Sequence, residues 1–213
     1  MDRWGHALIF HILDMIPTYI LGMQKMLNTL LALYQQGGDL VYAGESVTQL
    51  MHAWQCGRLA EKSGAPAALQ LASWLHDVGH LWGDLEGTPT LLGHDDLHER
   101  IGAEVLFPIF GPAVSEPVRL HVQAKRYLVS TRETYARKLS PDSVRSLQLQ
   151  GGIMQPDECA AFEAEPYFAD AVKLRVWDDL GKKSGWFDDT RQDALDHLMQ
   201  LMLQVSRERV TQI

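Results

Sequence analysis

Apolar residues recur at intervals of three and four along most of this 213-residue chain, a spacing typical of α-helices that bury one face. No segment of useful length alternates apolar and polar residues as a half-buried strand does, and we find no internal repeat. We therefore predict an all-α helical bundle that forms a single domain. The predicted helices cover residues 23–34, 46–62, 67–76, 97–107, 116–127, 131–137, 141–149, 156–164, 167–180 and 189–210.

Glycine and proline set the expected ends of these helices. We expect a loop over residues 79–95, with Gly79 ending the helix before it. Pro108 and Gly111 are expected to end the helix that starts at residue 97. Pro117 is expected in the first turn of the next helix, where its missing N–H is tolerated, and Ser140 is a candidate N-cap.

The beginning of the chain needs a separate interpretation. Residues 7–23 are mostly apolar, but His11, Asp14 and Pro17 interrupt them, so no run reaches the roughly 18 residues of a membrane span. The segment also lacks the basic start and the cleavage site of a secretion signal. We divide the chain into residues 1–22, which are an extra helix or an extension upstream of a natural start at Met23, and a domain over residues 23–213.

Charge and cysteine content disfavour several classes of protein. The 19 Lys and Arg against 27 Asp and Glu give a net charge of −8, which disfavours nucleic-acid binding because that binding relies on basic side chains. An anionic ligand has to be held by a few local cations. The two cysteines, Cys56 and Cys159, are too few for a disulfide framework and indicate a reducing, cytoplasmic location.

The strongest local signal is His76-Asp77-Val78-Gly79-His80, which follows an almost wholly apolar predicted helix. A buried carboxylate there needs a partner or a metal ion, although a His–Asp pair that satisfies itself is a simpler alternative. Imidazole and carboxylate ligands favour Zn, Fe, Mn or Ni over Ca. The candidates exceed what one tetrahedral ion needs, so we predict two metal ions sharing one carboxylate. The further candidates on other helices are His52, His98, His121, Asp178 and Asp179.

The pattern of His52, His76-Asp77 and Asp178 resembles the signature of the HD-domain superfamily, which is all-helical and mostly consists of metal-dependent phosphohydrolases. His98 and His121 match the subset with two metals. Two further segments are similar to the PhnZ-type phosphonate oxygenases, mixed-valent di-iron enzymes of this superfamily related to myo-inositol oxygenase. They are Leu120-His-Val-Gln-Ala-Lys-Arg-Tyr127 and Ser146-Leu-Gln-Leu-Gln-Gly-Gly152, and the resemblance covers about residues 40–183.

This resemblance implies two Fe ions in a mixed-valent Fe(II)/Fe(III) pair, with Asp77 as the bridge. Asp178 is preferred to Asp179 because the family's ligand is the first Asp after Trp. His98 is preferred to His94 because the following residues of the motif accompany it. Tyr42 is expected to ligate the iron that later receives substrate and to leave when substrate binds. The implied protein ligands are His52, His76, Asp77, His98, His121 and Asp178, with Tyr42 in addition.

The resemblance also implies contacts to the substrate. Glu45 is expected to hold an amine, while Lys125 and His80 are the candidates for the phosphonate group. Lys125 lies four residues after His121, hence on the same helical face, and its ammonium suits a compact dianion. Ser143, Ser146 and Gln150 are further candidate hydrogen-bond partners of the phosphonate oxygens. The candidate catalytic residues are Tyr42, Glu45, His80 and Lys125.

The implied reaction uses O2 as co-substrate to cleave the C–P bond of a 1-hydroxy-2-aminoethylphosphonate, or an N-methylated analogue, to phosphate and an amino acid such as glycine. The expected partner is thus a small organophosphonate, without nucleic acid or membrane. An HD-domain phosphohydrolase acting on a nucleotide or phosphate ester is the main alternative, and it predicts turnover without O2 and with Mn, Co or Ni. A non-catalytic binding module is disfavoured, because such modules typically lose the ligands that this chain retains.

Overall fold

The computed structural model of the chain describes residues 21–42, 45–82 and 93–211. These residues form helices connected by short loops and contain no β-strand, only one isolated antiparallel bridge between Val41 and Thr48. The predicted all-α helical bundle is therefore confirmed. Residues 21–37 are helical. The elements that follow are α2 (Gln49–Lys62), α3 (Ala67–Leu75), α4 (Val78–Trp82), α5 (His98–Phe110), α6 (Pro112–Thr131), the 3-10 turn η2 (Ala136–Lys138), α7 (Pro141–Leu149), α8 (Pro156–Glu163), α9 (Phe168–Leu180) and α10 (Arg191–Val210).

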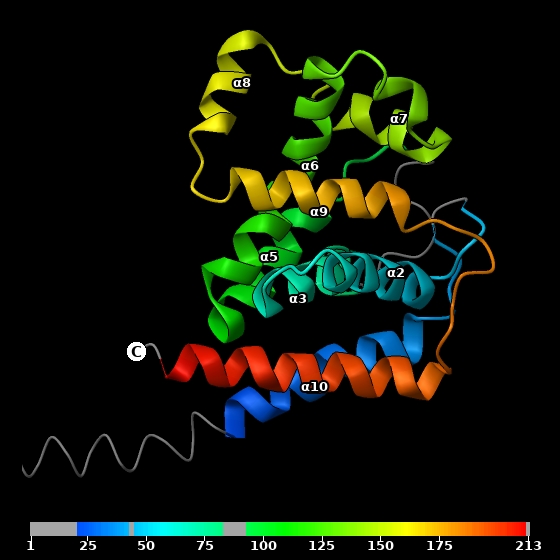
Figure 1. The fold of residues 1–213 in the computed structure, drawn as a ribbon, viewed down its shortest axis with the longest axis vertical. Helices are drawn as coiled ribbons and strands as arrows, with labels where there is room; N and C mark the ends of the chain where they lie inside the picture. Colours follow the sequence, from blue (N-terminus) through cyan, green and yellow to red (C-terminus); the bar gives the residue numbers. More distant parts are fainter. Residues whose placement is uncertain (1–20, 43–44, 83–92, 212–213) are drawn as a thin grey trace, which may run out of the picture.

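The helices stack along the long axis of the molecule (Figure 1). α10 lies at one end, α7 and α8 lie at the other, and α2, α3, α5, α6 and α9 fill the middle. α3 is the central element, because it contacts α2, α6, α9 and α10. Its residues Leu71 and Ala72 are fully buried and Trp74 almost so, as expected for a helix that is apolar on all sides. A smaller cluster around Leu120 and Phe162 joins α8 to α6.

Tertiary packing overrides the proline signals at two helix ends. α5 continues through Pro108 to Phe110, because Ile109 and Phe110 in its last turn belong to the main core. α6 begins at Pro112, so Pro117 lies inside the helix and not in its first turn. The expected helix over residues 131–137 is also wrong, since Arg132 is extended and only η2 follows it. Ser140 does cap α7, and its side chain accepts the backbone N–H of Ser143.

Gly79 does not end a helix, contrary to the prediction. It lies within α4, in the first part of the segment expected to be a loop. A Cβ atom at this position would lie 2.1 Å from the backbone oxygen of His98. The glycine therefore allows α4 to pass directly against the start of α5, which brings the His76–Asp77 corner close to His98. The remaining residues 83–92 of the expected loop lie outside the described residues.

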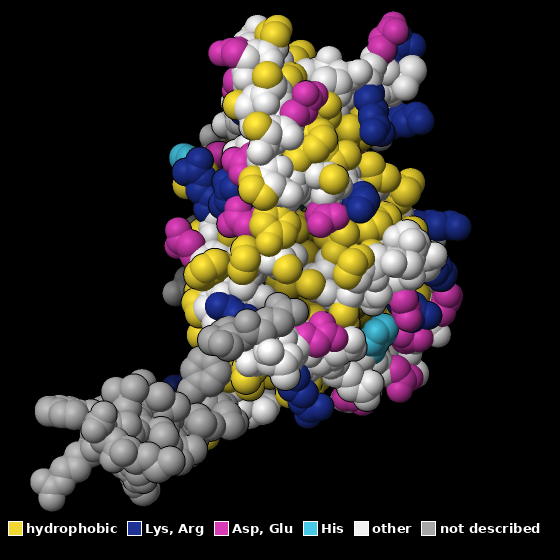
Figure 2. All heavy atoms as spheres, turned by 60° about the vertical axis from the view of Figure 1, so that its left-hand side comes forward, with side chains coloured by type: hydrophobic (Ala, Val, Ile, Leu, Met, Phe, Trp, Pro, Cys, Tyr) yellow, Lys and Arg dark blue, Asp and Glu magenta, His cyan; other side chains and the backbone are white. Residues whose placement is uncertain are grey.

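The N-terminal segment and the surface say little about the position of the functional site. The expected extra helix or extension over residues 1–22 lies almost entirely outside the described residues. Within the described part of the chain, none of the helices is both long and apolar enough to cross a membrane. One face shows hydrophobic side chains gathered between charged ones (Figure 2). Such apolar exposure is ordinary for a folded protein.

Candidate metal centre

The first half of the centre is a pair of buried histidines from neighbouring helices. His52 lies on α2, and His76 follows the last residue of α3. Their Nδ1 atoms lie 2.9 Å from the Gly181 oxygen and 3.0 Å from the Ser73 oxygen, respectively. A carbonyl oxygen can only accept, so each Nδ1 carries a proton and the Nε2 atom of each ring is the one left to bind a metal. The two Nε2 atoms face each other at 3.3 Å.

The second half repeats this arrangement. His98 begins α5 and His121 lies in the middle of α6. Nδ1 of His121 donates to the Val118 oxygen at 2.7 Å, and Nδ1 of His98 lies 2.9 Å from Oδ1 of Asp96. Their Nε2 atoms are 3.2 Å apart. Burial, together with His98 and His76, holds the pKa of His121 well below its usual range, which leaves its Nε2 lone pair available.

Asp77 lies between the two histidine pairs. Its Oδ2 is 3.6 Å from Nε2 of His52 and 3.4 Å from Nε2 of His76. Its Oδ1 is 3.5 Å from Nε2 of His98 and 3.7 Å from Nε2 of His121. Burial would raise the pKa of Asp77, but the surrounding histidines hold it well below its usual range. One ionised carboxylate therefore directs one oxygen to each pair of imidazoles.

Asp178 adds a second carboxylate to the first half. It lies near the end of α9, and its Oδ1 is 3.5 Å from Nε2 of His52 and 3.8 Å from Nε2 of His76. Its other oxygen, Oδ2, is 2.5 Å from Nη1 of Arg175. Burial would raise the pKa of Asp178, but Arg175 and then Lys182 hold it well below its usual range. Arg175 thus leaves Oδ1 directed toward the histidines.

The donor atoms fit a pair of metal ions. Bonds of about 2.1 Å place neighbouring ligand atoms about 3.0–3.5 Å apart, close to the distances within each half. Oδ2 of Asp77 is buried without a hydrogen-bond partner among the described residues, although buried oxygens normally have one. Oδ1 of Asp178 also lacks a hydrogen bond there and has only an ion pair with Lys182, whose Nζ lies 3.3 Å away. Both of these oxygens face the Nε2 atoms of His52 and His76. Mixed sets of imidazole and carboxylate donors suit Fe, Mn, Zn or Ni.

Lys125 lies beside this centre in a buried, positively charged region. It is 3% exposed, and its Nζ donates to Oγ of Ser146 at 2.7 Å and to Oε1 of Gln150 at 2.5 Å. Burial, followed by the charge of Arg175, lowers the pKa of Lys125 to about 7. Oγ of Ser143 is 3.3 Å from Nη2 of Arg175 and completes a set of hydroxyl and cationic groups. The structure therefore brings together three of the predicted substrate contacts, Lys125, Ser146 and Gln150, with Ser143 bound to the neighbouring Arg175.

The sequence reasoning missed Arg175 and Lys182. Nζ of Lys182 is 3.3 Å from Oδ1 of Asp178 and 3.5 Å from Oγ of Ser143. Gln55 fixes the loop after Lys182, because its Oε1 accepts the N–H of Lys183 at 2.9 Å and its Nε2 donates to the oxygen of the same residue. The two cations stand three residues before and four residues after Asp178. The spacing on one helical face was an available signal for Arg175, whereas Lys182 follows the end of α9 at Leu180.

Tyr42 and Glu45 lie in the loop before α2. The Tyr42 ring is stacked on the His52 ring with centroids 4.1 Å apart, and Nζ of Lys182 is 5.4 Å from its centre. Burial and then Asp77 raise the pKa of Tyr42 well above its usual range. Oε1 of Glu45 is buried without a hydrogen-bond partner in the described part of the chain. Tyr42 therefore lies directly against a candidate ligand of the first half.

Of the remaining candidate residues, His80 lies at the centre, whereas His94 and Asp179 do not. The ring of His80 is stacked on that of His98, with centroids 4.0 Å apart, and its Nε2 is 4.0 Å from Oδ1 of Asp77. His94 is exposed on the preceding loop. Asp179 points to Arg175 and Tyr135, away from the histidines. The geometry thus groups His80 with the centre.

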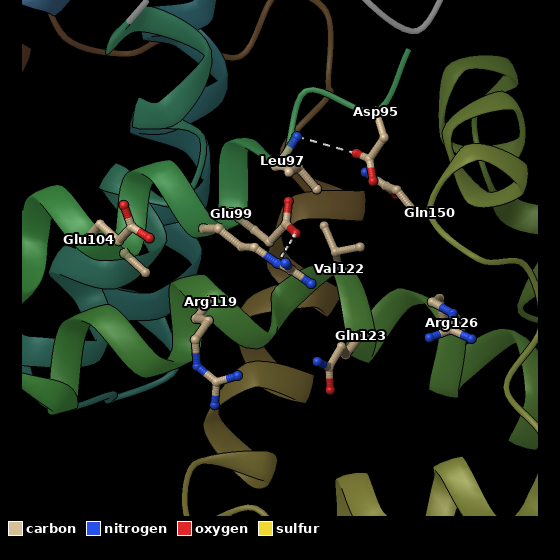
Figure 3. Close-up of a pocket in the computed structure, with 11 residues that line it drawn as sticks. Asp95, Leu97, Glu99, Glu104, Arg119, Val122, Gln123, Arg126 and Gln150 are labelled. Atoms are coloured by element: carbon tan, nitrogen blue, oxygen red, sulfur yellow. Dashed lines mark hydrogen bonds and ion pairs between the residues drawn. The ribbon is translucent and has the colours of Figure 1, made fainter. Parts of the chain in front are cut away.

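A separate pocket of about 410 Å³ opens on the outer side of α5 and α6 (Figure 3). Glu99, Arg119, Gln123 and Arg126 line it, and Gln150 reaches it from the end of α7. Because Gln150 also accepts from Lys125, this residue separates the pocket from the buried positively charged region. The pocket contains none of the candidate metal ligands.

Comparison with known proteins gives three informative relatives, although no model of a known protein family matches the chain. The chain is 46% identical over 162 residues to a hydroxymethylphosphonate dioxygenase of Gimesia maris, covering 76% of this chain and 80% of the relative. It is 38% identical over 152 residues to a glycine-betaine-forming [1-hydroxy-2-(trimethylamino)ethyl]phosphonate dioxygenase of Leisingera caerulea, covering 71% and 78%. An uncharacterised protein of Acanthamoeba polyphaga mimivirus is 37% identical over 158 residues, covering 73% and 72%.

Proposed function

This chain belongs to the family of phosphonate dioxygenases, and we propose that it is a di-iron enzyme that cleaves the C–P bond of a 1-hydroxyalkylphosphonate with O2. The preferred substrate in this proposal is 1-hydroxy-2-aminoethylphosphonate or an N-methylated analogue. One O2 and one such molecule have the atoms of one phosphate and one amino acid, glycine for the unmethylated substrate. The carbon that leaves phosphorus is oxidised to a carboxylate, and O2 is reduced.

The observation that carries this proposal is the pair of opposed Nε2 atoms on each side of Asp77. In this assignment the first iron would be held by His52, His76, Asp77 and Asp178, and the second by Asp77, His98 and His121. The second set has fewer protein donors than the first, and Tyr42 lies against His52 of the first set. When bound, the iron pair supplies the redox chemistry that O2 activation requires and that a purely Lewis-acidic metal lacks.

The buried cations account for binding of the phosphonate. A dianion is stabilised by charge-assisted hydrogen bonds in a region shielded from water. In our assignment Lys125 and His80 hold the phosphonate oxygens. Further hydrogen bonds to these oxygens come from Ser143, Ser146 and Gln150. Arg175 and Lys182 keep Asp178 ionised and add positive charge to the same region. The region thus counters locally the net charge of −8 of the whole chain.

Glu45 favours a substrate that carries an ammonium group. Its buried Oε1 has no hydrogen-bond partner among the described residues, and an ammonium donor would supply both the bond and the opposite charge. The 46% identity to a hydroxymethylphosphonate dioxygenase supports hydroxymethylphosphonate as the second candidate substrate. This smaller molecule has no amine, and its oxidation with one O2 gives formate and phosphate. The two candidate substrates therefore differ in whether they supply a hydrogen-bond donor to Glu45.

The direct test is anaerobic loading with Fe(II), followed by addition of O2 and a panel of hydroxyphosphonates, with released phosphate measured. We expect about two iron ions per chain and phosphate release that depends on O2. The aminated substrates are expected to have the highest kcat/KM. Phosphatase activity under nitrogen with Mn, Co or Ni would instead support the phosphohydrolase alternative.

Replacing Tyr42 by phenylalanine is expected to alter the reaction of the iron-loaded protein with O2 when no substrate is present. The variant keeps the ring stacked on His52 but loses the hydroxyl proposed to occupy an iron position. The absorption spectrum recorded during exposure to O2 measures this effect, and thermal unfolding checks that the fold is intact. Tyr127→Phe is the matched control, because that hydroxyl contacts Glu163 at the surface. An unchanged spectrum and rate in Tyr42→Phe would reject the gating role.

A further inference from the structure

Asp96 contacts two histidines of the proposed active site with one carboxylate. Its side chain is 4% exposed and lies in the loop before α5. Oδ1 is 2.9 Å from Nδ1 of His98, and Oδ2 is 2.6 Å from Nδ1 of His80. The sequence reasoning did not identify this residue, which lies outside any helical pattern. Its contacts join a proposed metal ligand to a proposed phosphonate contact.

The backbone around Asp96 is built to aim this carboxylate. Leu97 has a φ of 51° and is the one non-glycine residue with a positive φ in the described part of the chain. This left-handed conformation is unfavourable for a leucine, so surrounding contacts must maintain it. It turns the chain immediately before α5, and Oδ1 of Asp96 also accepts the backbone N–H of His98 at 3.4 Å. The carboxylate is thereby folded back over the first turn of the helix.

The two imidazole rings depend on this carboxylate for their orientation. They are stacked with centroids 4.0 Å apart and an interplanar angle of 19°. Oδ1 of Asp96 is hydrogen-bonded to Nδ1 of His98, and its Oδ2 is in ion-pair contact with Nδ1 of His80. With both Nδ1 atoms held by Asp96, the Nε2 atom of each ring is turned toward Asp77, at 3.5 Å for His98 and 4.0 Å for His80. A shift of either ring changes a contact of Asp96 and hence the position of the other ring.

We infer that Asp96 is a positioning residue that couples phosphonate binding at His80 to retention of the metal held by His98. This inference rests on the proposed function and adds a residue to it. Loss of an acceptor that orients a ligating histidine typically costs 10- to 100-fold in metal affinity. Because the same carboxylate orients His80, its loss is expected to weaken anion binding as well. Both effects arise from one side chain that touches neither substrate nor metal.

Two substitutions separate the position of the carboxylate from its charge. Asp96→Asn keeps the shape but replaces one acceptor oxygen by an NH2 donor, which cannot accept from a protonated Nδ1. Asp96→Glu keeps the charge but moves the carboxylate by one methylene. We expect both variants to bind fewer than two iron ions per chain and to bind inorganic phosphate about 10-fold more weakly than wild type. If Asp96→Glu behaves like wild type, the charge alone matters and the positioning role is wrong.

Asp95→Asn is the matched control. Asp95 precedes Asp96 in the same turn and accepts the N–H of Leu97 at 3.4 Å, but it contacts no histidine in the described ranges. We expect this variant to keep two iron ions and wild-type phosphate affinity, measured by calorimetry on the anaerobic Fe(II) protein. Thermal unfolding of the metal-free forms checks folding. Equal losses in Asp95→Asn and Asp96→Asn would mean that the loop is merely destabilised.

A cycle with His80→Ala tests the coupling itself. Once His80 is absent, Asp96→Asn should cause no further loss of phosphate affinity, yet it should still lower the iron content. Full additivity of the two substitutions in phosphate affinity would overturn the inference. Iron content and phosphate binding are measured without turnover. A failure of the proposed reaction, seen as no phosphate release from any hydroxyphosphonate by the wild type, is therefore distinguishable from a failure of the Asp96 assignment.

Discussion

Asp77→Asn is expected to reduce turnover of a hydroxyphosphonate by at least about a thousand-fold and to lower the iron content to one ion or none. Asparagine has nearly the same shape as aspartate, but it is neutral and presents one oxygen and one NH2 group. The substitution therefore removes the charge shared by the two histidine pairs and turns a hydrogen-bond donor toward one of them. Elemental analysis and phosphate release under O2 measure the two effects.

Asp188→Asn is a suitable control for this substitution. Asp188 is exposed and bonds only Nε1 of Trp186 in the described structure, at 3.1 Å. We expect the control to retain two iron ions and normal turnover. Far-ultraviolet circular dichroism should show that Asp77→Asn keeps its helices. If a folded Asp77→Asn protein still binds two iron ions with normal turnover, the shared-carboxylate arrangement is wrong.

The helical pattern was readable from the sequence, because apolar spacing directly reflects which face of a helix is buried. The last helix illustrates this: Leu198 and Met202, which follow the spacing, are fully buried in α10. Boundaries were less predictable where packing decides. Pro108 does not stop α5, because burial of the following Ile109 and Phe110 compensates for the missing backbone hydrogen bond. A rule based on neighbouring residues cannot include this burial, because it depends on contacts with distant parts of the chain.

Only some residues of the candidate site could be predicted from the sequence. The motif around His76 and Asp77 indicated metal binding from the residues alone. His121 was one of several candidate ligands on other helices, and family resemblance selected it. The structure gives a physical reason to group them, since Oδ1 of Asp77 is 3.7 Å from Nε2 of His121. Asp96 had no signal in the sequence, because its function depends on the turn at Leu97, an unusual conformation for leucine that no spacing rule predicts.

Lys125→Met is expected to lower kcat/KM for a hydroxyphosphonate by about a hundred-fold, mainly through a higher KM. A hydrogen bond to a charged group contributes about 1.5–3 kcal/mol, and each 1.36 kcal/mol changes the rate ten-fold. Methionine has a similar length, so packing against Ser146 and Gln150 is largely kept. The metal-free variant should be at least as stable as wild type near pH 7, because it no longer buries a cation without a carboxylate partner in the described structure.

The pH dependence of substrate binding provides an independent readout of the same residue. Burial lowers the pKa of Lys125 to about 7, helped by the cations Arg175 and Lys182 and opposed by Asp178 and Asp179. The ammonium that binds an anion is therefore populated below about pH 7 and lost above it. We expect the KM of the wild-type enzyme to rise as the pH increases past 7. In Lys125→Met this part of the profile should be flat.

A surface lysine separates this effect from a general loss of positive charge. Lys173 is exposed on α9 and pairs with Asp170 three residues earlier at 3.1 Å, so Lys173→Met removes one charge without changing the buried region. We expect it to leave KM and its pH profile unchanged, since exposed pairs contribute little. If Lys125→Met retains both the wild-type KM and its rise above pH 7, the phosphonate must be held elsewhere. The adjacent Arg175 and Lys182 are then the groups to replace next, because they are the other cations in the same buried region.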